Sequence, residues 1–205
     1  MSGASHWKMV DAVQRLRRDR SFRPLIDQVG PIELRARRPY FWTLCCAILA
    51  QQVSGAAARA IIGRVRALRP DRRLPNPDSM LRTSAVRLRK AGVSRQKARY
   101  LHALAEAFAQ GELSQVRFSR LSDEEIIRRL TAVVGIGKWT AEMFLMFSMR
   151  RPDVFPVDDF GIRRGMERYF GACVADDMVE RAERWRPYRT AASLYLWRAQ
   201  SAVPP

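Results

Sequence analysis

The sequence predicts an all-α protein, and two observations carry this prediction. Hydrophobic residues recur at helical spacing along almost the whole chain of 205 residues, and no segment shows the sustained alternation of a strand. Ser, Asp, Gly and Pro stand at the ends of the periodic segments, where they start and stop helices. With 47% hydrophobic residues, the chain can form one globular unit or two small lobes that share a cleft.

Three helices are predicted in the first 50 residues. The first spans about 5–18, and its buried stripe consists of apolar residues spaced three apart, namely Trp7, Val10, Val13 and Leu16. Arg23-Pro24 begins a short helix that ends near Gly30. The third helix, 40–50, is apolar on nearly every side, so we expect it in the middle of the fold.

Serine residues mark the starts of the middle helices. Ser54 precedes a helix over 55–68, which the proline-rich loop 69–77 ends. Shorter helices are expected at 78–81 and 85–90. Ser94 then caps a longer helix that closes at Gly111 and whose buried face holds Ala98, Leu101, Leu104, Ala105 and Phe108.

The remaining helices follow from equally clear boundary signals. The segment 122–125, Ser-Asp-Glu-Glu, has the form of a capping box. After the glycines of 134–137, another helix continues until Arg150-Arg-Pro152 breaks it, and its apolar face carries Ala141, Phe144, Leu145 and Ser148. Three more helices are expected, over 159–170, 176–184 and 187–200.

Positive charge is the strongest compositional signal. Lys and Arg total 37 against 20 Asp and Glu, which gives a formal net charge of +17. Such a surplus favours a polyanionic partner, with nucleic acid as the first candidate. The alternative is a basic protein that binds no polyanion and is merely rich in arginine.

Cysteine content and hydropathy exclude several classes of protein. Cys45, Cys46 and Cys173 fit neither a disulfide framework nor a four-thiolate metal or iron–sulfur site. The N-terminus has no apolar core of a signal peptide, and no stretch approaches the roughly 20 apolar residues that span a bilayer. We therefore expect a cytoplasmic protein that does not act at a membrane.

The segment LTAVVGIGKWTA, residues 130–141, is the most informative part of the chain. Two helices joined by Gly-Ile-Gly form a hairpin, and the backbone N–H groups of the turn and of the second helix point outward. Such groups make an anion site suited to a DNA phosphate. Glycine also occurs at tight helical turns that bind nothing.

A second segment, VFPVDDFGIRR at 154–164, gives the hairpin a context. The two segments together resemble the signature of the helix-hairpin-helix (HhH-GPD) DNA glycosylase superfamily, a hairpin followed by a loop that ends in an aspartate. The segments AILAQQVS (47–54), AERWRPYR (182–189) and YLW (195–197) are similar to those of 3-methyladenine DNA glycosylase II. The resemblance covers roughly residues 35–200.

The resemblance implies two helical lobes with a cleft between them, within one glycosylase unit over 1–205. Lobe A is expected at about 1–35 plus 160–205, and lobe B at about 36–159 with the hairpin at 122–150. Larger members of the family carry an additional N-terminal β-rich domain. The sequence has no room for it and is similar to the compact form.

The resemblance implies that Asp159 is the catalytic carboxylate. It stands three residues before Ile162-Arg163, as the family's aspartate stands before an aliphatic and a basic residue, and Asp158 is the weaker candidate. A carboxylate at a helix N-terminus is stabilised by the helix dipole, and it can stabilise an oxocarbenium-like sugar and orient water. The alternative is that both aspartates are ordinary helix caps, and the two roles are compatible.

Aromatic side chains are expected to select the base, because an electron-rich ring attracts a cationic base face. Trp139 and Trp197 match aromatic pocket positions of the family. Met143 stands where some relatives have a tyrosine, which indicates a roomier pocket. Core packing is the alternative reading for Trp139 and Trp197. Tyr40, Phe41 and Trp42 are expected mainly in the core, although one of them, such as Phe41 or Trp42, could line the pocket.

The expected DNA contacts lie in the hairpin and at one helix end. The resemblance implies that the turn Gly135-Ile136-Gly137, together with Lys138 and Thr140, faces the DNA backbone. It also implies that Gln52 fills the hole left by a flipped nucleotide and hydrogen-bonds the orphaned base. A solvated surface lysine and a polar helix end are the alternatives for Lys138 and Gln52.

The resemblance implies one bound ion and no other cofactor. In the family, main-chain carbonyls of the hairpin hold a monovalent cation, Na⁺ or K⁺, and the matching carbonyls here belong to Thr131, Val133 and Ile136.

The expected function is therefore a monofunctional DNA glycosylase of base excision repair. It would act as a monomer on duplex DNA with alkylated bases, such as 3-methyladenine or 7-methylguanine, and would be associated with the nucleoid through that DNA. Trp139 stands where bifunctional members have a Schiff-base lysine, and the four-cysteine cluster of endonuclease III is missing. Two alternatives remain open, a non-catalytic helix-hairpin-helix DNA-binding protein and a bifunctional glycosylase/lyase for oxidised bases.

Overall fold

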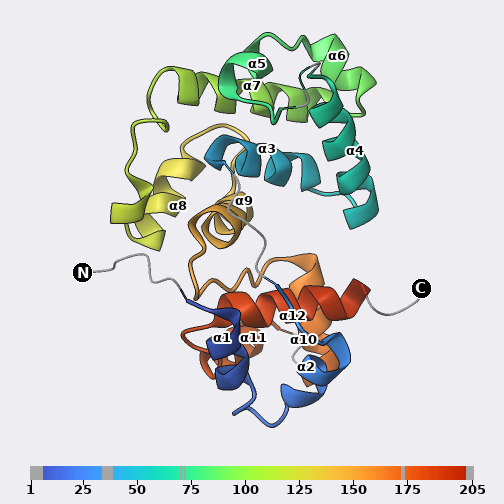
Figure 1. Cartoon of the computed structure of the whole chain (residues 1–205), viewed down its shortest axis with the longest axis vertical. Coiled ribbons are helices and arrows are strands. Elements are labelled where there is room, and N and C mark those ends of the chain that lie inside the picture. Colours follow the sequence, from blue (N-terminus) through green and yellow to red (C-terminus); the bar gives the residue numbers. More distant parts are fainter. Residues whose placement is uncertain (1–6, 34–38, 70, 72, 172–173, 202–205) are drawn as a thin grey trace. The chain divides into compact units, whose positions relative to one another are not determined.

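The computed structural model describes residues 7–33, 39–69, 71, 73–171 and 174–201. Within these residues all regular structure is helical and no strand is present (Figure 1). The prediction of an all-α chain is confirmed. Across the same residues, no helix is both long enough and apolar enough to cross a membrane.

The chain divides into two compact units. The first combines Gly3–Ala36 with Arg150–Pro205, and the second spans Arg37–Met149. Each unit has its own buried hydrophobic residues.

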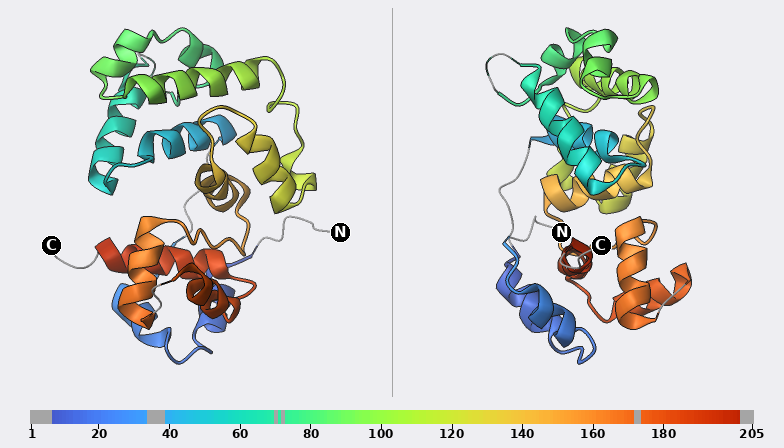
Figure 2. Two further views of the ribbon diagram at one scale, coloured as in Figure 1. Left: turned by 180° about the vertical axis from the view of Figure 1, so that it is seen from behind. Right: turned by 90° about the vertical axis from the view of Figure 1, so that its right-hand side faces the viewer.

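The first unit is built around its C-terminal helix. Its helices are α1 (Met9–Leu16), α2 (Arg23–Val29), α10 (Phe160–Phe170), α11 (Ala175–Glu183) and α12 (Arg189–Ser201). Helix α12 packs against α1, α2 and α10, and the side view shows α1 and α2 on one side of α12 with α10 on the other (Figure 2, right). Aromatic rings fill the space between them: Phe22 meets Trp185 edge-on at a centroid distance of 4.9 Å and Tyr195 at 6.2 Å.

The predicted buried stripe of the first helix needs one correction. Val10 is 64% exposed, whereas Ala12 and Leu16 are buried. The helix begins at Met9 rather than near residue 5, so the buried face follows the spacing of four between Ala12 and Leu16. Trp7 lies before the helix, and its indole N–H donates to the carbonyl oxygen of Arg150 at 2.8 Å.

The second unit is built around α3. Its elements are α3 (Tyr40–Ala50), α4 (Gly55–Ala67), α5 (Pro77–Leu81), α6 (Ala85–Lys90), α7 (Arg95–Ala109), η1 (Phe118–Arg120), α8 (Asp123–Thr131), α9 (Lys138–Phe144) and the π-helical turn η2 (Leu145–Met149) that continues α9. Helix α3 packs against α4, α7 and α9, and its residues from Phe41 to Leu49 are buried. The expectation that this helix lies in the middle of the fold is confirmed.

Polar caps start the helices of this unit as the sequence predicts. The side chains of Ser54, Ser94 and Ser122 each accept a hydrogen bond from the backbone N–H three residues later, at 3.2 Å in each case. The carboxylate of Glu125, expected to complete a capping box, instead pairs with Arg128 and Arg129. Among the cysteines, Cys45 and Cys46 are buried, and Cys173 lies outside the described residues.

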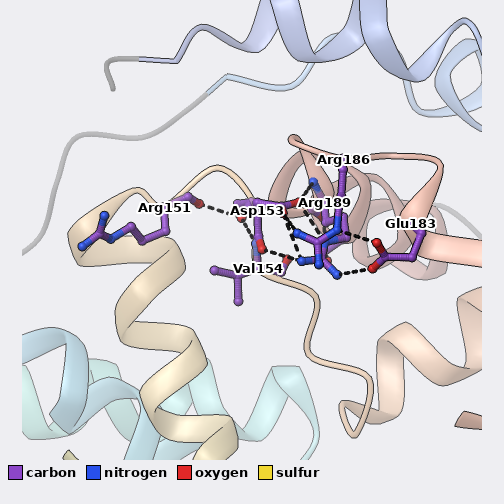
Figure 3. A network of polar contacts seen from close by, with 8 residues as sticks. Arg151, Asp153, Val154, Glu183, Arg186 and Arg189 are labelled. Carbon is purple, nitrogen blue, oxygen red and sulfur yellow. Dashed lines mark hydrogen bonds and ion pairs between the residues drawn. The ribbon is translucent and has the colours of Figure 1, made fainter. Parts of the chain in front are cut away.

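The segment that leads to α10 is tied to the start of α12 (Figure 3). The Thr190 hydroxyl donates to the carbonyl oxygen of Arg151 at 2.7 Å and accepts from the N–H of Val154 at 3.0 Å. The carboxylate of Asp153 accepts from Nε of Arg189 at 2.8 Å, and that arginine is only 13% exposed.

These bonds explain where the units divide. The expected lobe boundary near residue 160 lies ten residues too late, because the first unit resumes at Arg150. Arg186 and Glu183 extend the same ionic network (Figure 3). The loop before α10 is thereby held by α12 at its beginning, well ahead of Asp159.

Candidate active site and nucleic-acid interface

Asp159 is the N-cap of α10. Its backbone is extended, with φ −71° and ψ 128°, and its Oδ1 accepts the N–H of Ile162 at 2.9 Å. The side chain is half-buried, whereas Asp158 is exposed. A helix N-terminus is a position that suits an acidic side chain.

A second hydrogen bond reaches the same carboxylate from α12. The indole Nε1–H of Trp197 donates to Oδ1 of Asp159 at 2.7 Å. Trp197 is half-buried, and the sequence predicted it only as a wall of the base pocket. The structure therefore adds a contact: this tryptophan orients the carboxylate predicted to be catalytic.

Gly161 allows this contact, and the sequence analysis missed its importance. A Cβ at this position would lie 2.8 Å from Cδ1 of Trp197 and 3.2 Å from Oδ1 of Asp159. One turn later, a Cβ on Gly165 would lie 2.9 Å from Cδ2 of Leu196. Two glycines four residues apart therefore let α10 approach α12 closely, a spacing that could have been noticed in the sequence.

The hairpin joins α8 to α9 in the second unit. Gly135 has φ +90°, a backbone conformation that residues other than glycine rarely adopt. A Cβ at this position would lie 2.1 Å from Cγ of Tyr100. Ile136 is buried and its N–H donates to the carbonyl oxygen of Val133 at 3.0 Å. Gly137 is the N-cap of α9. The turn is thus fixed by the packing of Tyr100 as well as by its own backbone bonds.

Gln51 holds the hairpin from the end of α3, which the sequence analysis did not predict. Its Nε2 donates to the carbonyl oxygen of Gly135 at 2.9 Å and to Oγ1 of Thr140 at 3.0 Å. The ammonium group of Lys97 in turn donates to the carbonyl oxygens of Leu49 at 2.9 Å and Gln51 at 2.7 Å. Partial burial lowers the pKa of Lys97.

Gln52 occupies an unusual backbone conformation beside this anchor. Its φ is +53°, which is uncommon for a residue with a side chain, and the residue is exposed. Such a conformation persists only where neighbouring contacts impose it. The bonds of Gln51, the residue directly before it, join the turn that presents Gln52 to the hairpin and to Lys97.

Lys138 and Thr140, both predicted to contact DNA, differ in how exposed their side chains are. Lys138 has a side chain that is 59% exposed, and its Nζ lies 3.9 Å from Oε1 of Glu142. Thr140 is only 1% exposed, and its hydroxyl accepts from Gln51. The Thr140 side chain therefore braces the hairpin from inside, and a DNA contact by this residue stays a prediction.

The aromatic candidates also separate into two kinds. Trp139 on α9 is half-buried, and Met143 one turn later is buried. Phe41 and Trp42 on α3 are 5% and 4% exposed, and the ring of Phe41 meets that of Phe108 edge-on at 5.4 Å. Phe41 and Trp42 thus have the core packing that the sequence favoured for them.

Comparison with known proteins identifies the family. The model of the HhH-GPD superfamily of base excision DNA repair proteins matches residues 45–189. The chain belongs to this superfamily. Its matched region contains the hairpin, Gln51 and Asp159.

Individual relatives within the superfamily are similar over most of their length. DNA-3-methyladenine glycosylase 1 of Schizosaccharomyces pombe is 34% identical over 187 residues, which are 88% of this chain and 82% of the relative. The solved structure of the S. pombe 3-methyladenine DNA glycosylase in complex with abasic DNA has a TM-score of 0.81 at 33% identity and covers 91% of this chain and 95% of its own. A DNA-3-methyladenine glycosidase of Bacillus halodurans has a TM-score of 0.75 at 34% identity and covers 97% and 90%.

Among the described residues, no group of three or more His, Cys, Asp or Glu side chains could hold a metal ion. The carbonyls of Thr131, Val133 and Ile136, which the resemblance implies as ligands of a cation, belong to the end of α8 and the turn that follows it. The Val133 carbonyl accepts the N–H of Ile136 at 3.0 Å.

Proposed function

We propose that this chain is a monofunctional DNA glycosylase that excises alkylated bases, of the 3-methyladenine and 7-methylguanine type, from duplex DNA. The observation that carries the proposal is the carboxylate of Asp159, held at the start of α10 by the N–H groups of Ile162 and Trp197. Relatives named DNA-3-methyladenine glycosylase support it.

The chemistry requires little beyond a fixed negative charge. As the bond between C1′ and the base nitrogen breaks, its electron pair leaves with the base and positive charge develops on the sugar. The carboxylate of Asp159 stabilises that charge and orients the water whose oxygen bonds to C1′, and it accepts the proton that this water loses. An N3- or N7-alkylated purine already carries positive charge, so the base leaves without a strong general acid.

Positioning residues keep this carboxylate in one orientation. The indole of Trp197 and the cap bond to Ile162 both end on Oδ1, and the absence of a side chain at Gly161 lets the indole approach. A preorganised group is worth more than a mobile one, because no free energy is spent on reorienting it as charge develops.

The base and the backbone are bound by residues of the second unit. We infer that Trp139 stacks on the alkylated base and that Gln52 enters the space of the flipped nucleotide, since its turn is held rigidly by Gln51. The turn Gly135–Gly137 and Lys138 bind a DNA phosphate. The carbonyls of Thr131, Val133 and Ile136 would hold Na⁺ or K⁺, which would supply further positive charge for that phosphate.

The decisive experiment replaces Asp159 and compares it with its neighbour. Asp159→Asn retains the helix cap but lacks the charge, so it should abolish release of 3-methyladenine and 7-methylguanine from methylated DNA while duplex binding persists. Asp158→Asn is the matched control, because this exposed carboxylate is one residue away, and it should excise at the rate of the unchanged protein. Equal excision by both variants would remove Asp159 from the mechanism, and no excision by the unchanged protein would favour the non-catalytic alternative.

The same preparation decides between simple hydrolysis and a lyase. Trp139 provides no amine for a Schiff base, so borohydride should trap no covalent complex with lesion-containing DNA. A stable protein–DNA adduct would contradict the monofunctional proposal.

A further inference from the structure

A cavity of about 680 Å³ in the first unit is lined almost entirely by arginines. They come from the last turn of α1, the turn that follows it, and the end of α11, and they are Arg15, Arg18, Arg20, Arg181 and Arg184. This arginine cavity shares no residue with the site around Asp159.

The one aspartate in the lining does not neutralise this charge. Oδ1 of Asp19 accepts the backbone N–H of Ser21 at 3.0 Å and the Ser21 hydroxyl, and Oδ2 accepts Nε1–H of Trp185 at 3.1 Å. Nη2 of Arg181 is 3.9 Å from Oδ2. The carboxylate is therefore directed into the protein, toward the Trp185 core, and serves mainly internal hydrogen bonds.

The arginines of the cavity differ in how firmly they are held. The guanidinium of Arg181 lies 4.7 Å from the ring centroid of Phe170 and donates to the Ser21 hydroxyl, while its Nε is buried and has no acceptor among the described residues. Within the same described part of the chain, the other four guanidinium groups take part in no hydrogen bond or ion pair. Four like charges held around one cavity repel each other, and a bound anion would relieve that repulsion.

We propose that the arginine cavity binds phosphate groups of a DNA backbone, as a second DNA contact besides the hairpin. Guanidinium groups present a planar fork of donors that matches phosphate oxygens, and a cavity of this volume accommodates more than one phosphate. Of the described residues that line it, none is aromatic or aliphatic, so the cavity offers nothing to stack on a base or to anchor an acidic protein segment. These features favour the phosphodiester backbone, read without regard to sequence.

The inference rests on the proposed function only in taking DNA as the polyanion, and its test requires no excision. Binding of the full chain to an undamaged duplex is measured by fluorescence anisotropy at several salt concentrations. Replacing Arg15, Arg18, Arg20 and Arg184 by Gln should flatten the log–log salt slope by about 2 or more, because each lost phosphate contact removes about 0.9. Arg181 is left unchanged, since its contacts with Phe170 and Ser21 are structural.

Matched variants make the test specific. A variant with the same loss of charge in the second unit, Gln at the exposed positions Arg66, Arg82, Arg89 and Arg95, should lower the slope less. Replacement of the four cavity arginines by Lys should preserve most of the slope, because the positive charge remains.

Three outcomes would overturn the inference. The first is an equal slope for the cavity variant and the second-unit variant. The second is an equal loss for the Lys and Gln variants of the cavity. The third is that the Gln variant of the cavity loses binding of tripolyphosphate but keeps the full salt slope of duplex binding. That result would assign the cavity to small polyphosphates. Failure of the proposed function would appear differently, as no excision of 3-methyladenine by the unchanged protein.

Discussion

Two glycines, one in each unit, are each required because an aromatic ring lies close to them, yet for different reasons. Gly161 is helical, and a Cβ there would lie 2.8 Å from Trp197. Gly135 lies in the hairpin turn, and it combines a φ of +90° with a Cβ position 2.1 Å from Tyr100. The first glycine is required only for space, while the second is required for both space and backbone conformation.

The two regions also differ in the kind of chemical group that their hydrogen bonds keep in place. Around Asp159, side chains and an N–H group fix a charged group that is proposed to act on the sugar. Around the hairpin, the neutral amide of Gln51 fixes a backbone carbonyl and a hydroxyl. Damage to the first region should therefore affect the rate of chemistry, and damage to the second should affect stability and DNA binding.

The largest expected effect on stability is that of Gly135→Ala. Strain at a positive φ and collision with Tyr100 should together lower the free energy of unfolding by about 3 kcal/mol, measured by chemical denaturation. Gly171→Ala is the matched control, since Gly171 has φ +66° but nothing within 4 Å of its Cβ position. It should cost only about 1 kcal/mol, and equal losses would show that Tyr100 is irrelevant.

Gly161→Ala should reduce catalysis more than stability. Displacement of Trp197 from Asp159 should slow single-turnover excision by about 100-fold, because small misplacements near the reacting centre have effects of that size. Gly63→Ala in α4 is the control, because a Cβ there meets nothing within 4 Å. If both variants excise equally fast, the close approach of Trp197 does not orient the carboxylate.

Gln51→Leu should have an intermediate effect on the hairpin. Loss of the bonds to Gly135 and Thr140 leaves two groups unsatisfied and should lower the free energy of unfolding by about 1–2 kcal/mol, with weaker duplex binding. Gln52→Leu is the control for stability, since Gln52 is exposed. A Gln51 variant as stable as the Gln52 variant would contradict the bracing role.

The smallest effect concerns pH. Burial raises the pKa of Asp19, but bonds from Ser21 and Trp185 and the charge of Arg181 outweigh it, so the pKa lies below its ordinary value of 3.8. The carboxylate therefore adds stability above about pH 4 that is lost as the pH falls through the lowered pKa. The melting temperature should fall more steeply with acid in the unchanged protein than in Asp19→Asn. The loss of melting temperature caused by Gln51→Leu should not change over the same pH range, since an amide does not titrate. Parallel curves of melting temperature against pH for the unchanged protein and Asp19→Asn would contradict the expectation.

Much of the local structure could be predicted because its causes lie within a few residues. Ser54, Ser94, Ser122 and Asp159 were recognised as caps, and each side chain bonds to a backbone N–H three residues later. The family and the carboxylate followed from short motifs for the same reason. The start of the first helix was misplaced, since no cap residue marks Met9: its N-cap, Lys8, makes no side-chain cap bond.

The remaining contacts could not be predicted from residue types and spacing. The bond from Gln51 to Gly135 joins residues 84 apart, and that from Trp197 to Asp159 joins residues 38 apart. Thr140 follows the hairpin, and its place on a short helix packed against α3 turns its side chain inward. Gln51 rather than Gln52 braces the hairpin because of the backbone turn at Gln52. Residue type cannot distinguish the two, since both are glutamines at adjacent positions.

The sequence by itself determined the helices, their caps, the hairpin and the carboxylate proposed to be catalytic, because these depend on hydrophobic period and on hydrogen bonds across three or four residues. Only the tertiary structure decided which side chains hold that carboxylate and that hairpin, where the first unit resumes, and that five arginines converge on one cavity. Such contacts arise when helices far apart in the chain pack together, and their geometry depends on the space that particular glycines leave open.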